Sequence, residues 1–275
     1  MIEIGRLNLL KASRQAKQGW YLCNEAGQEV LLPNKYVPDS LKQGAEMEVF
    51  IYNDSEDRIT ATTLRPKIQL NEFALLKVKE VNQIGAFLDW GLEKDLLVPF
   101  SEQQKKMQKN QSYLVYLYLD ARTERLVASS KLNQFLDNEN IQLEKGEAVD
   151  LIIGEGTDLG VKVIINSKYS GLIFHNEIFT QLSPGQRTKG YIKNIRPDNK
   201  IDVSLRQEGY ANVPPNVQKL LNLLRENDGF LNLNDKSDPA LIQEKLEMSK
   251  KTFKKAIGAL YKDRIINLEP EGIRL

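Results

Sequence analysis

The sequence is very poor in the residues that build disulfides and metal sites. Its 275 residues include one cysteine, Cys23, and one histidine, His175. A single cysteine forms no internal disulfide, and neither residue has a second cysteine or histidine with which to share a metal ion. We therefore interpret Cys23 as a small buried residue and His175 as a surface residue at the end of a strand, and we expect no metal site.

Long apolar runs and cofactor-binding loops are also missing. The longest apolar runs, such as Leu151-Ile152-Ile153, have the length of strands, so we expect no membrane span and no membrane partner. The N-terminal residues 1–5 lack the pattern of a signal peptide. No G-x-x-x-x-G-K-[ST] loop is present, and Gly154-Glu155-Gly156 lacks the strand-to-helix context of a dinucleotide site. We expect a cytoplasmic protein that is not an enzyme, with no catalytic residues and no cofactor.

Neither sign of charge dominates. The chain has 38 basic and 37 acidic residues, and residues 67–132 and 214–275 each carry a net charge of only +2. A strong, non-specific binder of duplex DNA presents a far more basic surface. Any affinity for nucleic acid must therefore come from local basic patches and from stacking on aromatic side chains.

The chain contains a unit that occurs three times with nearly constant spacing. In each copy a glycine opens a strand-like run, a second run ends fourteen residues later, and a basic residue begins the last run. In chain order, these positions are Gly19, Pro33 and Arg58; Gly85, Pro99 and Arg125; and Gly160, Phe174 and Lys200. Such self-similarity predicts three copies of one structural unit.

Each copy has the pattern of a small β-barrel. Alternation of apolar and polar residues in 47–52 and 201–205 predicts half-buried strands, and each copy has five such runs in about 65 residues. Five antiparallel strands remove their exposed edges by closing into the barrel of the OB-fold. We therefore predict a mostly β, multidomain protein with three tandem five-stranded OB-type barrels at residues 1–66, 67–132 and 146–207, and a domain boundary within 133–148.

After Pro214-Pro215 the apolar period changes from two to about 3.6, which indicates helices. Asn216 is expected to cap the first helix, Asp238 the second and Ser249 to open the third. The inward-facing residues of the first helix are Val217, Leu220, Leu221 and Leu224, and those of the third are Phe253, Ala256, Ile257 and Leu260. A closing β-hairpin completes the pattern of an α+β winged-helix domain at residues 213–275.

The second copy resembles the ribosomal protein S1 RNA-binding domain. The resemblance lies in Gly85-Ala86-Phe87-Leu88-Asp89, in residues 97–101 and in residues 125–129. Where that family often has a histidine facing the ligand, this chain has Pro33, Pro99 and Phe174. Three such domains followed by a winged helix resemble the conserved virulence factor B family, and this resemblance implies RNA binding and a part in post-transcriptional control of gene expression.

Candidate RNA contacts follow from what single-stranded RNA offers, because its bases stack on aromatic rings and its phosphates attract basic side chains. The candidates for stacking are Tyr21, Phe87 and Phe174. The candidates for phosphate contact in the barrels are Arg58, Lys77, Lys79, Arg125, Lys162 and Lys200. Those in the winged helix are Lys250, Lys251, Lys254 and Lys255, on the helix face opposite the apolar stripe. For the aromatic residues burial in a core is the competing interpretation, and Trp20 and Trp90 either stack on bases or pack at barrel ends.

The leading hypothesis is a single-stranded RNA-binding protein that acts through several weak sites linked on one chain. A second hypothesis is a DNA-binding regulator led by the winged helix, with the barrels as scaffold. A third is a protein-interaction adaptor, for example on the ribosome, whose barrels have lost ligand binding.

Overall fold

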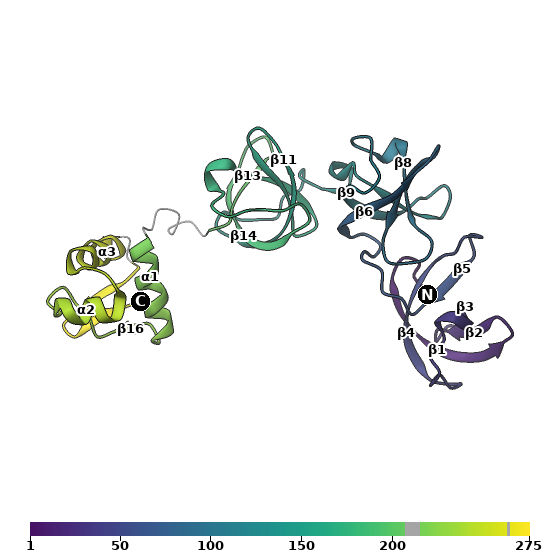
Figure 1. The fold of residues 1–275 in the computed structure, drawn as a ribbon, viewed down its shortest axis with the longest axis horizontal. Helices are drawn as coiled ribbons and strands as arrows, with labels where there is room; N and C mark the ends of the chain where they lie inside the picture. The colour runs from purple at the N-terminus through teal and green to yellow at the C-terminus, as the bar shows by residue number, and fades with distance from the viewer. Residues whose placement is uncertain (207–214, 263–264) are drawn as a thin grey trace.

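The protein consists of three five-stranded β units followed by an α+β domain, as the sequence predicts (Figure 1). The computed structural model describes residues 1–206, 215–262 and 265–275. Among these residues no helix is long and apolar enough to cross a membrane. The three β units are named barrels 1, 2 and 3 in chain order, and the domain after them is the winged helix.

In barrels 1 and 3 the fifth strand lies between the third and the fourth, whereas in barrel 2 the fifth strand pairs with the fourth alone. Barrel 1 consists of β1 (Leu7–Ala16), β2 (Gly19–Cys23), β3 (Glu29–Pro33), β4 (Glu46–Asn53) and β5 (Ile59–Thr62). Barrel 2 consists of β6 (Phe73–Val81), β7 (Gly85–Asp89), β8 (Leu96–Pro99), β9 (Ser112–Leu119) and β10 (Leu126–Ser129). Barrel 3 consists of β11 (Ala148–Gly156), β12 (Gly160–Ile165), β13 (Tyr169–Phe174), β14 (Arg187–Ile195) and β15 (Ile201–Ser204). Barrels 1 and 3 are closed by a short parallel pairing of the third and fifth strands, whereas barrel 2 forms an open five-stranded sheet.

The spacing of fourteen residues in the repeat has a direct structural cause. Each repeat glycine is paired across the antiparallel ladder with the residue fourteen positions on, as in Gly85 with Pro99 and Gly160 with Phe174. The backbones approach so closely that a Cβ on Gly160 would lie 2.0 Å from the carbonyl oxygen of Ile173. The same close approach occurs at Gly19 and Gly85, so the glycine is required by the pairing itself.

Barrels 1 and 2 share one apolar core. Phe50 and Tyr52 of β4 are buried together with Trp90, which follows β7. The ring centroids of Phe50 and Trp90 are 5.7 Å apart with a near-perpendicular orientation, which is a favourable edge-to-face geometry. Side chains of both barrels thus fill one cluster, and this cluster fixes barrel 1 against barrel 2.

Barrel 3 packs against barrel 2 through a second, smaller cluster and through the segment that joins them (Figure 1). Phe73 and Leu114 of barrel 2 are buried with Ile152 and Ile164 of barrel 3, and Phe135 of the joining segment packs on them. The segment includes a 3-10 turn, η3 (Leu132–Phe135). The predicted boundary region 133–148 therefore connects two barrels, but its side chains are docked on both of them.

The winged helix contains α1 (Pro215–Glu226), α2 (Pro239–Leu246) and α3 (Lys250–Lys262), with the short strands β16 (Phe230–Leu231), β17 (Asn267–Glu269) and β18 (Gly272–Arg274). The predicted apolar residues of α1 and α3 are all buried in one core. Asp238 caps α2 by accepting a hydrogen bond from the Ala240 amide at 2.8 Å, as predicted. The prediction for α1 is wrong, because the helix begins at Pro215 and Asn216 is its second residue; a proline at a helix start is favoured by its fixed φ.

Candidate nucleic-acid interface

Barrels 2 and 3 each carry a groove whose lining includes residues of their second, third and fifth strands. The groove of barrel 3 encloses a cavity of 430 Å³, and that of barrel 2 a cavity of 440 Å³. Three of the predicted contact residues, Lys162, Phe174 and Lys200, line the groove of barrel 3. Two others, Phe87 and Arg125, line the groove of barrel 2. The repeat positions singled out in the sequence are therefore brought together in space in both barrels.

In barrel 3 the groove combines apolar surface with basic side chains. Lys162 on β12 is exposed and has no hydrogen bond or ion pair within the described part of the chain. Phe174 is half-buried at the end of β13, and the Arg196 guanidinium lies over its ring at 5.4 Å from the centroid. Arg196 is held there by Asp202, whose carboxylate accepts from the guanidinium at 2.9 and 3.0 Å and raises its pKa. A half-exposed ring beside a planar cation and a free lysine suits a stacked base and its phosphate.

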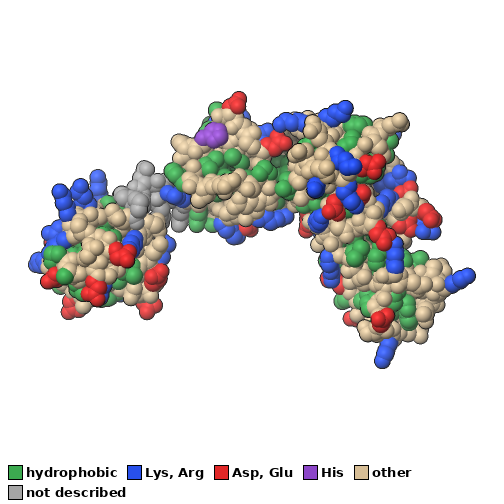
Figure 2. All heavy atoms as spheres, in the orientation of Figure 1, with side chains coloured by type: hydrophobic (Ala, Val, Ile, Leu, Met, Phe, Trp, Pro, Cys, Tyr) green, Lys and Arg blue, Asp and Glu red, His purple; other side chains and the backbone are tan. Residues whose placement is uncertain are grey.

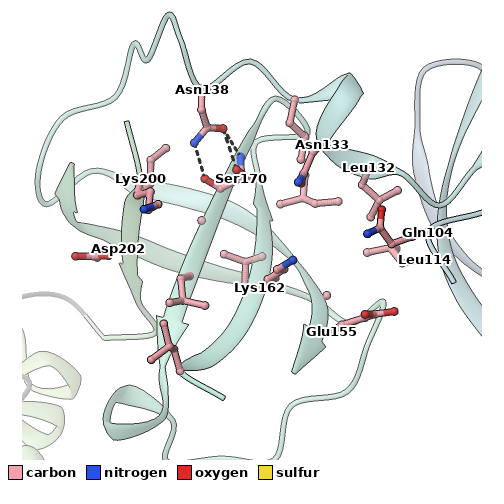
Figure 3. Close-up of a pocket in the computed structure, with 18 of the residues that line it drawn as sticks. Gln104, Leu114, Leu132, Asn133, Asn138, Glu155, Lys162, Ser170, Lys200 and Asp202 are labelled. Carbon is pink, nitrogen blue, oxygen red and sulfur yellow. Dashed lines mark hydrogen bonds between the residues drawn. The ribbon is translucent and has the colours of Figure 1, made fainter. Parts of the chain in front are cut away.

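One wall of this groove is the joining segment, not the barrel itself. Figure 3 shows Asn138 above β13, with its amide bound to Ser170. The Asn138 amide nitrogen donates to the carbonyl oxygens of Ser170 and Asn199 at 2.9 and 3.0 Å, and its oxygen accepts from the Ser170 amide at 2.7 Å and from the Ser170 hydroxyl at 3.1 Å. Asn138 thus ties the segment to β13 and to the turn between β14 and β15, beside the pairing of β13 with β15 that closes the barrel.

In barrel 2 the groove is bordered by barrel 1. The β4–β5 turn of barrel 1 places Asp57 at its rim, where the carboxylate accepts from Arg125 at 2.5 Å and from Lys94 at 3.2 Å. Lys94 also donates to the backbone carbonyl of Asp54 at 2.6 Å. The side chains lining this groove include two basic and three acidic ones, whereas those lining the groove of barrel 3 include four basic and two acidic ones. The lining side chains therefore carry a net negative charge in barrel 2 and a net positive charge in barrel 3.

The candidates in barrel 1 are occupied by contacts of their own. The ring of Tyr21 is covered by the Arg14 guanidinium at 3.8 Å from the centroid, and Arg14 is paired with Glu29 at 2.8 Å. Arg58 pairs with Asp54 and with Glu56, so its charge is balanced within its own turn. Neither Tyr21 nor Arg58 lines either of the two grooves.

The two candidate lysines of β6 lie on the outer face of that strand and outside the groove. Lys77 is exposed and unpaired within the described residues, while Lys79 pairs with Asp95 at 2.6 Å, which raises the pKa of its ammonium group. Trp90 is 2 % exposed and its indole nitrogen donates to the Lys94 carbonyl at 2.5 Å. Trp90 is thus a core residue, and of the two roles considered for it only packing remains.

The four candidate lysines of α3 do not form one uniform surface. Figure 2 shows basic side chains gathered where Figure 1 places α3. Lys250 is half-buried and donates to the Ser237 carbonyl at 2.8 Å, and Lys254 lies 3.8 Å from the Asp235 carboxylate. Lys251 and Lys255 are exposed and, within the described residues, have neither a hydrogen bond nor an ion pair.

Several groove residues were not found from the sequence. Asn138, Arg196 and Lys94 have no counterparts at fixed spacing in the other copies, so comparison of the repeats gave no signal for them. His175 is exposed, and its ring nitrogen Nε2 donates to the Thr157 carbonyl at 3.0 Å. Among the described residues, no three His, Cys, Asp or Glu side chains are grouped in a way that would hold a metal ion.

Comparison with known proteins agrees with this domain order. Residues 4–64 and 72–131 match the model of the S1 domain, and residues 218–275 match that of the CvfB-like winged helix domain. A protein of Staphylococcus saprophyticus named conserved virulence factor B is 28 % identical over 99 % of this chain and 94 % of its own length. The Staphylococcus aureus protein of the same name is 28 % identical over 86 % of this chain and 81 % of its own length.

A solved structure also resembles the chain. A crystal structure of a multidomain protein with nucleic acid binding domains from Streptococcus pneumoniae is 22 % identical and covers 99 % of this chain and 98 % of its own, with a TM-score of 0.45. The matched S1 domains make this chain a nucleic-acid-binding protein.

Proposed function

The chain belongs to the conserved virulence factor B family, and we propose that it is a single-stranded RNA-binding protein of the cytoplasm. It acts in post-transcriptional control of gene expression, through binding and not through catalysis. Its sites are several and individually weak, and their linkage on one chain raises the overall affinity.

The observation that carries the proposal is the groove of barrel 3. Lys162, Phe174 and Lys200 meet there around a cavity of 430 Å³, beside the Arg196 guanidinium. Proteins that bind single strands combine a basic groove with aromatic platforms, and each stacked base contributes about 1–3 kcal/mol. The excess of basic over acidic side chains in this groove favours a polyanion, and the apolar floor favours unpaired bases over a closed duplex.

Fluorescence anisotropy of the full-length protein tests the proposal. Labelled single-stranded RNA, single-stranded DNA and duplex DNA of one sequence are titrated with the wild type and with Lys162→Gln. We expect the tightest binding to single-stranded RNA, weakened in the variant, with a log–log salt slope lower by about 0.7 because one phosphate is no longer bound. Equal binding of all three nucleic acids, or an unchanged slope in the variant, contradicts the proposal.

A second candidate is duplex DNA bound by the winged helix. It is favoured by one observation, that Lys251 and Lys255 on α3 are exposed and have no partner among the described residues, since the corresponding helix of helix-turn-helix proteins enters the major groove. Tightest binding to duplex DNA, lost in a Lys251→Gln/Lys255→Gln variant and kept in Lys162→Gln, would favour this function over RNA binding.

A further inference from the structure

The β4–β5 turn of barrel 1 reaches two basic side chains of the barrel 2 groove. Asp57 at the tip of this turn contacts both Arg125 and Lys94 from one carboxylate. Arg125 begins the last strand-like run of its repeat, as Lys200 does in barrel 3. A carboxylate and a phosphate oxygen make the same kind of charge-assisted hydrogen bond to these cations. In the groove of barrel 2, the anion that Arg125 and Lys94 bind is therefore a carboxylate of the same chain.

The turn is held in this place by apolar packing that does not depend on the ion pairs. Residues Phe50 and Tyr52 of β4, immediately before the turn, are buried against Trp90 in the core that barrels 1 and 2 share. The backbone of Asp57 has φ 60°, a left-handed conformation that asparagine and glycine adopt more readily than most residues. The carboxylate can thus be removed with little disturbance of the turn or of the interface.

The equivalent turns of the other barrels show that this contact is particular to barrel 1. The residues before Arg58, Arg125 and Lys200 are Asp57, Glu124 and Asn199, and all three have positive φ values of 53° to 60°. Glu124 makes no side-chain hydrogen bond or ion pair within the described residues. Asn199 is uncharged, and its carbonyl accepts from Asn138 beside the groove of barrel 3. Of these three described turns, only that of barrel 1 presents a carboxylate to the cations of a neighbouring barrel.

We propose that Asp57 is an intramolecular competitor of RNA phosphate, which keeps a second RNA site in the groove of barrel 2 from binding until the strand displaces the carboxylate. The inference rests on the proposed RNA binding and adds its regulation. Phe87, half-exposed in the same groove, is the stacking platform of this second site. Barrel 3, whose Lys162 has no such partner among the described residues, is the site that binds first.

The test compares Asp57→Asn with Glu124→Gln in the full-length protein, with a labelled single-stranded RNA oligonucleotide as the probe. The two changes remove the same charge from equivalent turns, so they alter the net charge equally. We expect Asp57→Asn to raise RNA affinity about fivefold, because an exposed ion pair changes an equilibrium by up to about that factor. The salt slope should steepen by about 0.7 for each further phosphate that the variant binds. Glu124→Gln should change neither quantity, and Asp57→Gly should reproduce the increase in affinity if the asparagine variant folds poorly.

A double variant identifies where the increase arises. Asp57→Asn/Arg125→Gln should lose most of the increase, because Arg125 is the cation that loss of the Asp57 carboxylate frees for phosphate. An unchanged affinity in both Asp57 variants, or an increase fully retained in the double variant, overturns the inference. If the wild type binds RNA but Asp57→Asn does not bind more tightly, only this inference fails; if no variant binds RNA, the proposed function fails with it.

Discussion

Because Asn138 anchors the joining segment, we predict that this one side chain stabilises both barrel 3 and the segment against local unfolding. Asn138 takes part in four hydrogen bonds, two donated to carbonyl oxygens and two accepted from Ser170. Each such bond contributes a net stabilisation of about 0.5–1.5 kcal/mol, and water replaces part of the loss at a half-buried site. We expect Asn138→Ala to lower the free energy of unfolding of barrel 3 by about 2–4 kcal/mol, a large share of the stability of a small domain.

Hydrogen exchange followed by mass spectrometry measures this effect locally. The Ser170 amide donates to the Asn138 side chain, so peptides that cover β13 and residues 136–147 should exchange faster in Asn138→Ala. Limited proteolysis within 136–147 should accelerate in parallel, because that segment loses its attachment. Asn140→Ala is the matched control, since within the described residues the Asn140 side chain forms hydrogen bonds only to Asp137 of the same segment. Equal protection of β13 in the two variants would refute the reasoning.

Three further predictions concern RNA contacts and stability. Phe174→Ala should weaken RNA binding by about 1–3 kcal/mol, and Phe87→Ala should weaken it less in the wild type than in an Asp57→Asn background; a large drop in melting temperature with unchanged RNA affinity would assign both rings to packing. Changing Lys251 and Lys255 together to Gln should leave the winged helix folded, since Gln is a good helix former, and should lower the salt slope for RNA binding; an unchanged slope would make these lysines a solvated surface. Hydrogen bonds from Lys193 and Ser204 lower the pKa of the Glu177 carboxyl, so its contribution to stability is complete above its unfolded pKa of about 4.3 and is lost as the pH falls through the folded value. Glu177→Gln should therefore destabilise the protein near neutral pH and much less at about pH 3, as chemical denaturation at the two pH values would show.

The fold was largely predictable because its signals are local and repeated. In every barrel a Cβ at the repeat glycine would lie 2.0 to 2.3 Å from a carbonyl oxygen of the next strand, so no other residue fits there. Because the same requirement recurs, Gly19, Gly85 and Gly160 revealed the repeat unit and its spacing. Alternation and helical periodicity likewise identified the strands and α3. The prediction that Asn216 caps α1 is wrong by one or two residues, because Pro215 and Asn216 are both acceptable near the start of a helix.

The site was predictable only in part. Comparison of repeats finds what the copies share, and it singled out Lys162, Phe174 and Lys200, which the structure brings together in one groove. It gave no signal for contacts between unlike copies, such as the pairing of Asp57 with Arg125 across 68 residues or of Asn138 with Ser170 across 32. These contacts depend on how one domain lies on the next, and no periodicity within a domain encodes them.

The core shared by barrels 1 and 2 has a consequence for how the protein is divided. Phe50, Tyr52 and Trp90 belong to one buried cluster although the repeat boundary runs between them. A fragment that began or ended at that boundary would expose these rings to water, and exposed apolar patches of this kind promote association. A truncated fragment should therefore keep the two barrels together, even though the sequence records them as two copies.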